Sequence, residues 1–112
     1  MKKQPLYLLL ALAALPLVAQ ADAGAVTIVF PADNATLDAK TENRISYDVT
    51  PGSQGDHTHL YIDGKEVAVL RELKGSYALK SLAPGAHEMC IKVVNKNHTP
   101  IGIEKCVKVK VE

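Results

Sequence analysis

Short apolar and β-branched runs separated by turn signals are the feature that most constrains this fold. After residue 24, no 11-residue window has the spacing of an amphipathic helix. Asp63-Gly64 favours a two-residue hairpin turn, because both residues tolerate positive φ. The pattern predicts seven short strands at spacings of about 8 to 15 residues, which is typical of an antiparallel sandwich. These strands cover residues 26–30, 44–50, 57–62, 65–70, 75–80, 87–94 and 103–111.

Two stretches of the chain resemble parts of known domains. Residues 30–37, Phe-Pro-Ala-Asp-Asn-Ala-Thr-Leu, resemble the opening of bacterial immunoglobulin-like domains. Residues 79–87, Leu-Lys-Ser-Leu-Ala-Pro-Gly-Ala-His, are similar to the corner of fibronectin III-like domains. The resemblance is to small exported domains of unassigned function. It implies an all-β, antiparallel immunoglobulin-like (fibronectin III-like) β-sandwich, and almost nothing about chemistry.

Two features depart from the antibody-type pattern. The chain contains no tryptophan, so the core is expected to consist mainly of Val, Ile and Leu. Its two cysteines lie on the last two predicted strands, so they cannot form the bridge between sheets that antibody domains contain. We therefore expect the sandwich architecture without the antibody-type core.

Residues 1–23 have the layout of a secretory signal peptide. Two lysines precede an apolar run over residues 6–18, and small residues follow it. The run is shorter than the roughly 20 apolar residues that a membrane-spanning helix needs. We therefore expect cleavage after Ala21 or Ala23, a periplasmic or secreted location, and one immunoglobulin-like domain over residues 24–112 without a membrane span.

The expected mature domain is nearly neutral. Removing Lys2 and Lys3 leaves 11 basic against 12 acidic residues if cleavage follows Ala21. This balance gives no electrostatic reason to expect nucleic acid or an anionic membrane as a partner. The sequence also lacks a glycine-rich phosphate loop, a zinc-protease helix and a nucleophile elbow. We therefore expect a domain that is not an enzyme.

Cys90 and Cys106 are the only cysteines in the chain. Export would place them in an oxidising compartment, which favours a disulfide. Directly opposed residues on paired strands lie within the distance that a disulfide allows. The alternative is that the two thiolates bind a metal ion.

The register that opposes the two cysteines makes further predictions. Opposite charges meet on the face that carries the cysteines, and apolar residues meet on the other face. Lys105 opposite Ile91 does not fit, and a β-bulge there is the one explanation that we can offer. The other predicted pairs are Glu88–Lys108, Lys92–Glu104, Met89–Val107 and Val93–Ile103.

His57 and His59 are the residues that most suggest a binding site. They are two positions apart on a predicted strand, so both lie on the same face. Leu60 and Ile62 are expected to face the core, which turns His57, His59 and Tyr61 outward. Two imidazoles in this arrangement lie roughly 6 to 7 Å apart, close enough to bind one ion.

The topology that the resemblance implies adds a third histidine. The loop that carries Asp56 and the loop that carries His98 lie at the same end of a fibronectin III-like sandwich. Asp56, His57, His59 and His98 are therefore expected to converge. His87 is expected at the opposite end, in the corner position where such folds use a hydrogen-bonding tyrosine.

Three imidazoles with a carboxylate or a water suit Cu(II) or Zn(II). Cu(I) is disfavoured, because Met89 is the one methionine outside the signal segment. The leading hypothesis is thus an exported domain that binds Cu(II) or Zn(II). The alternative is a non-catalytic interaction or structural module that contacts another protein of the cell envelope. In that case the histidines form only a solvated polar end of the domain. A glycan or small-ligand binder is less expected, since Tyr47, Tyr61 and Tyr77 are the few candidate aromatic platforms.

Overall fold

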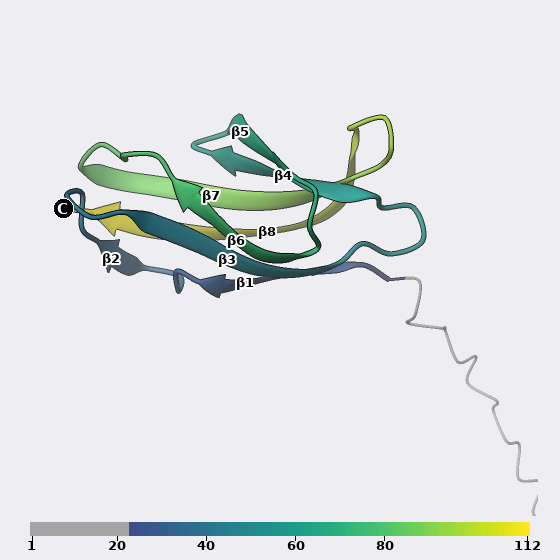
Figure 1. The fold of residues 1–112 in the computed structure, drawn as a ribbon, viewed down its shortest axis with the longest axis horizontal. Helices are drawn as coiled ribbons and strands as arrows, with labels where there is room; N and C mark the ends of the chain where they lie inside the picture. Colours follow the sequence, from purple (N-terminus) through teal and green to yellow (C-terminus); the bar gives the residue numbers. More distant parts are fainter. Residues whose placement is uncertain (1–22) are drawn as a thin grey trace, which may run out of the picture.

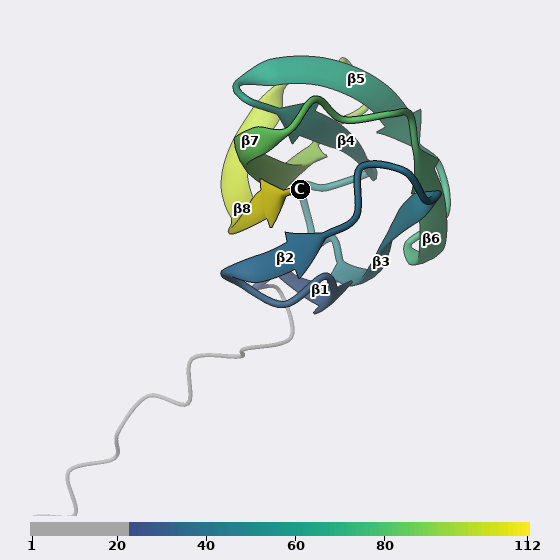
Figure 2. The ribbon, with the colours of Figure 1, turned by 90° about the vertical axis from the view of Figure 1, so that its left-hand side faces the viewer.

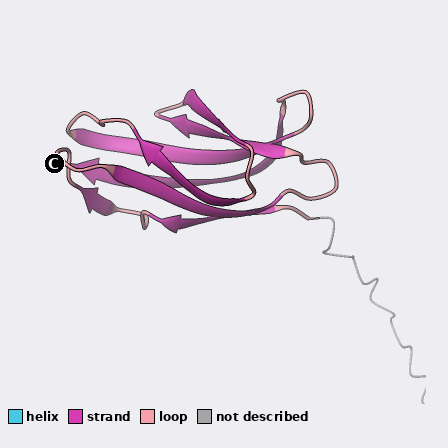
Figure 3. Ribbon diagram, in the orientation of Figure 1, coloured by secondary structure: helices cyan, strands magenta, loops and turns pink. Residues whose placement is uncertain are grey.

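The computed structural model describes residues 23–112. The predicted signal peptide therefore lies outside the described residues, apart from Ala23. Eight strands joined by loops make up the described chain (Figures 1 and 3). None of residues 23–112 belongs to a helix long and apolar enough to cross a membrane. The strands are β1 (Ala25–Phe30), β2 (Ala35–Leu37), β3 (Asn43–Thr50), β4 (His57–Ile62), β5 (Lys65–Leu70), β6 (Lys74–Leu79), β7 (Gly85–Val94) and β8 (Pro100–Val111).

The strands form two sheets packed face to face, seen from one end in Figure 2. One sheet has the order β1-β3-β6, and the other has the order β2-β8-β7-β4-β5. The predicted all-β sandwich is therefore confirmed. The predicted number of strands was one too few, because β2 was missed, and β2 runs parallel to β8. A strand of three residues is too short to show an alternating pattern in the sequence.

The core between the sheets is mainly aliphatic, as the lack of tryptophan predicts, although Tyr47 is buried in it as well. Ile45, Leu60 and Ile91 are completely buried, and Met89 is buried with them. The one phenylalanine, Phe30, is 49% exposed. Burial of the aliphatic side chains is therefore the main favourable contribution to folding.

The hairpin of β7 and β8 has the predicted register over most of its length. Cys90 opposes Cys106, and the two form a disulfide. The two cysteines are therefore not free thiolates that could bind a metal ion. Three further predicted pairs are also opposed: Glu88–Lys108, Lys92–Glu104 and Met89–Val107.

The register changes near the tip of this hairpin. Val94 opposes Pro100, so residues 101–103 together lie opposite Val93, and the predicted Val93–Ile103 pair is not part of the regular register. The extra residues of β8 centre on Gly102, which has a φ of 89°. Glycine adopts such a backbone conformation readily, which explains the bulge at this position.

The expected bulge at Lys105 is not present. Lys105 opposes Ile91 in the regular register. Its side chain is nevertheless exposed, because β2 pairs with β8 only from Val109 onward and leaves this part of β8 at the sheet edge. Charged side chains at such edges also disfavour pairing with other chains.

Candidate metal site

Three histidine rings meet on the outer face of the five-stranded sheet. Nε2 of His57 lies 3.1 Å from Nε2 of His59 and 3.1 Å from Nδ1 of His98. Nε2 of His59 lies 2.9 Å from the same atom of His98. The structure thus brings together the three histidines that the sequence proposed as ligands, although His98 lies far from the other two in the chain.

β4 and the β7–β8 loop supply these rings. His57 begins β4, and the loops on either side of the site lie at the same end of the sandwich (Figure 1). Leu60 faces the core, so the outward direction of His57 and His59 is as predicted. The two rings are not solvated, however, because each is only 2% exposed. They pack against each other and against His98, which is itself exposed.

Asn95 shapes the loop that carries His98. Its Oδ1 atom accepts hydrogen bonds from the backbone N–H groups of Asn97 and Thr99, at 2.9 and 3.0 Å. The backbone N–H of His98 donates to the carbonyl oxygen of Asn95 at 3.0 Å. His98 itself has a φ of 62°, in the left-handed region. These bonds stabilise a backbone conformation that turns the His98 ring back over β4.

Gly55 brings the β3–β4 loop close to β7. A Cβ atom at this position would lie 2.2 Å from the carbonyl oxygen of Pro51 and 2.6 Å from Cγ1 of Val93. The following residue, Asp56, donates its backbone N–H to the carbonyl oxygen of Val94 at 2.8 Å. Only glycine therefore fits at residue 55, where the loop comes close enough to β7 for Asp56 to make this hydrogen bond.

Two carboxylates contact the remaining nitrogens of the buried rings. Oδ2 of Asp56 lies 2.9 Å from Nδ1 of His57, and Oε1 of Glu66 lies 2.8 Å from Nδ1 of His59. The hydrogen bond from His57 is the main cause that lowers the pKa of Asp56. Asp56 thus contacts the ring nitrogen that faces away from the cluster of three nitrogens.

Glu66 was not among the predicted site residues. In a regular strand, residues two positions apart share a face. β5 has a bulge at Val67, so Glu66 opposes Tyr61 on the outer face while Ala68 opposes the core residue Leu60. The predicted hairpin turn after β4 already implied the pairing of Glu66 with Tyr61, and this was the available signal for a carboxylate near the histidines.

The three histidine rings have too few N–H groups to give every one of the three facing nitrogens a hydrogen-bond partner. A carboxylate only accepts hydrogen bonds, so Nδ1 of His57 and Nδ1 of His59 carry the hydrogens. In neutral rings, the two Nε2 atoms then carry lone pairs that face each other at 3.1 Å. His98 has at most one N–H to offer them from Nδ1. A cation between the three nitrogens would use all of these lone pairs, and carboxylates commonly orient metal-binding histidines in this way.

His87 lies apart from the cluster, at the start of β7. Its Nδ1 atom lies 2.6 Å from Oδ2 of Asp63, and its Nε2 atom lies 2.6 Å from the carbonyl oxygen of Ala83. The hydrogen bond to Asp63 and then the bond to Ala83 raise the pKa of His87. His87 thus bonds to backbone a few residues upstream, as expected for the corner position.

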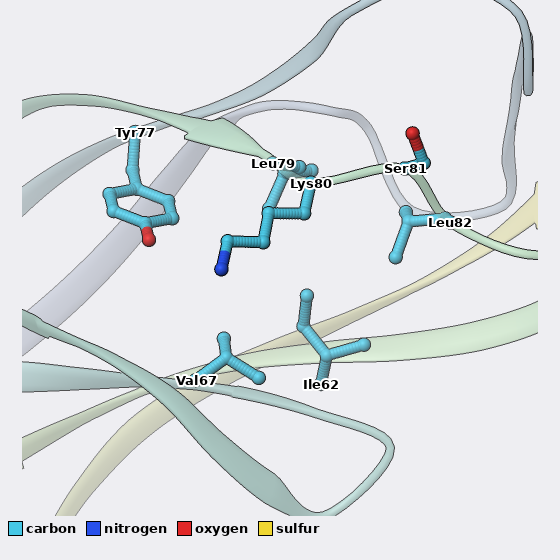
Figure 4. Close-up of a pocket in the computed structure, with 7 residues that line it drawn as sticks. All are labelled: Ile62, Val67, Tyr77, Leu79, Lys80, Ser81 and Leu82. Carbon is cyan, nitrogen blue, oxygen red and sulfur yellow. The ribbon is translucent and has the colours of Figure 1, made fainter.

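A shallow apolar groove of about 340 Å³ lies between the edge strands β5 and β6, away from the histidines. Figure 4 shows the Lys80 side chain extended over it. The other residues that line the groove are Ile62, Val67, Tyr77, Leu79, Ser81 and Leu82.

Comparison with known proteins shows the fold but no family. No protein-family model and no curated protein matches the chain. Among solved structures, fibronectin III-like modules of Clostridium thermocellum CbhA are similar, with a TM-score of 0.63 and 18% identity over 78% of this chain and 95% of that chain. A lytic polysaccharide monooxygenase of Jonesia denitrificans gives a TM-score of 0.53 and 15% identity over 73% of this chain and 60% of that chain.

A third similar structure is the CARDB domain of the PF1109 protein from Pyrococcus furiosus, which was solved in complex with di-metal ions. Its TM-score is 0.50, with 12% identity over 79% of this chain and 89% of that chain. At these identities the likeness concerns the fold alone. The chain is therefore an immunoglobulin-like, fibronectin III-like sandwich, as the resemblance in the sequence implied.

Proposed function

We propose that this domain is an exported, non-catalytic module that binds one Cu(II) or Zn(II) ion through His57, His59 and His98. The observation that carries the proposal is the triangle of three ring nitrogens, which lie 2.9 to 3.1 Å from one another. Zinc–nitrogen bonds are about 2.0 to 2.1 Å long. With bonds of that length, these separations correspond to nitrogen–metal–nitrogen angles of roughly 90 to 100°.

Cu(II) is the better fit of the two ions. Angles near 90° are closer to the tetragonal geometry of Cu(II) than to the tetrahedral geometry of Zn(II), and Cu(II) binds nitrogen sites more tightly in general. The sulfur ligands that Cu(I) prefers are not free to bind. Cys90 and Cys106 form the disulfide, and Met89 is completely buried in the core.

Asp56 was predicted as a fourth ligand, and we propose a different role for it. Its carboxylate holds Nδ1 of His57, and Glu66 does the same for His59. Such contacts fix which nitrogen carries the hydrogen and how the ring is turned. Asp56 and Glu66 would therefore act as positioning residues.

Export is supported by the signal-like pattern of residues 1–23 together with the disulfide, because disulfides persist mainly in oxidising compartments. The intact mass of the exported protein tests this proposal. A chain that begins at Asp22 or Gly24 is expected. Retention of residues 1–21 would contradict the proposed processing.

Calorimetric titration of the tag-free exported protein with Cu(II) and Zn(II) tests the metal site. One ion per chain is expected, bound more tightly than about 100 μM, with Cu(II) ahead of Zn(II). Binding should weaken in acid, because protons compete for the imidazole nitrogens. Replacing His57, His59 or His98 with Ala should weaken binding strongly, while His87→Ala should hardly affect it. Equal effects from all four substitutions, or no binding at this level, would contradict the proposal.

A second candidate function is a protein-interaction module of the cell envelope. The observation that favours it is the apolar groove beside β5, an edge strand on which Val67 and Val69 are 44% and 41% exposed. Edge strands with exposed apolar residues can pair with another chain. This function becomes the leading one if the titration shows no metal binding, and Val67→Asp should then abolish partner binding.

A further inference from the structure

We infer that the metal ion in this site keeps at least one coordination position for a small anion from solution, of the carboxylate, phosphate or azide type. The inference rests on the proposed function and extends it. A closed structural site would be filled by protein ligands, whereas this one would exchange its last ligand with the surroundings.

The site offers too few protein donors to fill the coordination shell of the ion. Within residues 23–112, no fourth His, Cys, Asp or Glu offers an atom close to all three nitrogens. Asp56 and Glu66 are engaged on the opposite sides of the two buried rings. Oδ1 of Asn95 is occupied by two backbone N–H groups of its own loop. Cu(II) and Zn(II) take at least four ligands, so three histidines leave the coordination shell incomplete.

The three nitrogens lie close together and leave one side of the ion open. Three donors only 2.9 to 3.1 Å apart occupy one side of the ion. With bonds of about 2.0 to 2.1 Å, an ion bound to all three nitrogens would stand to one side of them. The opposite side of the ion then has room for ligands that do not come from these rings. Because His98 is exposed while the other two rings are buried, solvent borders the site along the β7–β8 loop.

The charges at the site favour an anionic ligand. Neutral imidazoles leave the full charge of a divalent ion in place, and a bound cation is often the strongest local charge in a site. Lys96 in the β7–β8 loop and Arg71 directly after β5 both lie close enough to Asp56 to act on its charge. Neither side chain has an ion-pair partner within the part of the chain that the structure describes. Their two positive charges offset the negative charges of Asp56 and Glu66 on the far sides of the rings, so the charge of the divalent ion is not compensated and favours an anion over a neutral or cationic ligand.

Azide titration of the 1:1 Cu(II) complex of the exported protein tests the inference. Azide should produce a saturable charge-transfer band in the absorption spectrum and should change the electron paramagnetic resonance spectrum, while the copper stays bound. Acetate and phosphate should compete with it. Spectra that stay unchanged up to about 100 mM azide, or copper that azide removes from the protein, would overturn the inference and leave metal binding intact. Failure to form the copper complex at all would overturn both the proposed function and this inference.

Charge variants give a second readout. Arg71→Ala combined with Lys96→Ala should raise the dissociation constant of azide by roughly threefold to tenfold, as expected for two exposed charges. It should tighten copper binding rather than weaken it, because the positive field that attracts an anion repels the cation. Lys40→Ala is the matched control, because Lys40 is an exposed lysine next to the C-terminal end of the sandwich. An equal effect from Lys40→Ala, or none from the double variant, would contradict the role assigned to the two basic residues.

Discussion

Oε1 of Glu66 lies 2.8 Å from Nδ1 of His59, across the hairpin of β4 and β5. Asp56 makes the equivalent contact with His57 from the adjacent position in the chain. Each carboxylate accepts the hydrogen of Nδ1, so the Nε2 atom of each ring is directed toward His98 with its lone pair free. The two acidic residues thus determine how the histidine cluster presents its nitrogens.

Replacing Glu66 or Asp56 with Ala should therefore weaken Cu(II) binding by roughly 10- to 100-fold, because the rings lose the groups that orient them. Competition titration against a chelator of known affinity measures the change. Glu104→Ala is the control, since Glu104 is an exposed carboxylate on the same hairpin as His98. If Asp56→Ala weakened binding as much as His57→Ala, Asp56 would be a direct ligand, as the sequence first suggested.

Replacing both Cys90 and Cys106 with Ala should lower the free energy of unfolding by about 3 kcal/mol, because the disulfide closes a short loop in the unfolded chain. The two residues are 16 positions apart. Urea unfolding of the two proteins measures the difference. Two thiols that react freely with an alkylating agent in the native, non-reduced protein would contradict the disulfide.

The contact between His87 and Asp63 predicts a dependence of stability on pH. Hydrogen bonds to Asp63 and to the carbonyl of Ala83 raise the pKa of His87 above its ordinary value of 6.5. The bond from His87 in turn lowers the pKa of Asp63 below 3.8. The stabilisation by His87 is therefore complete below about pH 6.5 and is lost as the pH rises through the raised pKa. The contribution of Asp63 is complete above 3.8 and is lost in stronger acid.

The free energy of unfolding of the protein, minus that of His87→Gln, isolates this contribution. The difference should be largest between about pH 4 and pH 6, at roughly 1 kcal/mol because Asp63 is half exposed, and should shrink toward pH 9 and in stronger acid. A chelator in all samples removes any effect of bound metal, and the three clustered histidines are the same in both proteins. A difference that grows as the pH rises from about 6 to 9 would contradict the assignment.

The parts of the site that follow from regular structure could be predicted from the sequence. Alternation along β4 placed His57 and His59 on one outward face, and the sandwich topology placed His98 at the same end. The opposed cysteines predicted the register of β7 and β8, including two opposite-charge pairs, because a two-residue period leaves few ways to bury the apolar face.

The parts that depend on irregular backbone could not be predicted. The bulge at Val67 moves Ala68 opposite Leu60, and the bulge around Gly102 changes the pairing near the hairpin tip. His98 packs against His57 and His59 from a loop in which its own backbone is left-handed and Asn95 binds neighbouring N–H groups. Each of these features departs from the regular two-residue alternation, which is the signal that a strand leaves in the sequence.

Electron paramagnetic resonance of the 1:1 Cu(II) complex, in continuous-wave and pulsed form, tests the metal site most directly, because it detects coordinated imidazole nitrogens. The account predicts three bound imidazoles in the unchanged protein, two in His98→Ala, and three in His87→Ala. A spectrum without imidazole nitrogens, or the same number of bound imidazoles in His98→Ala as in the unchanged protein, would contradict it.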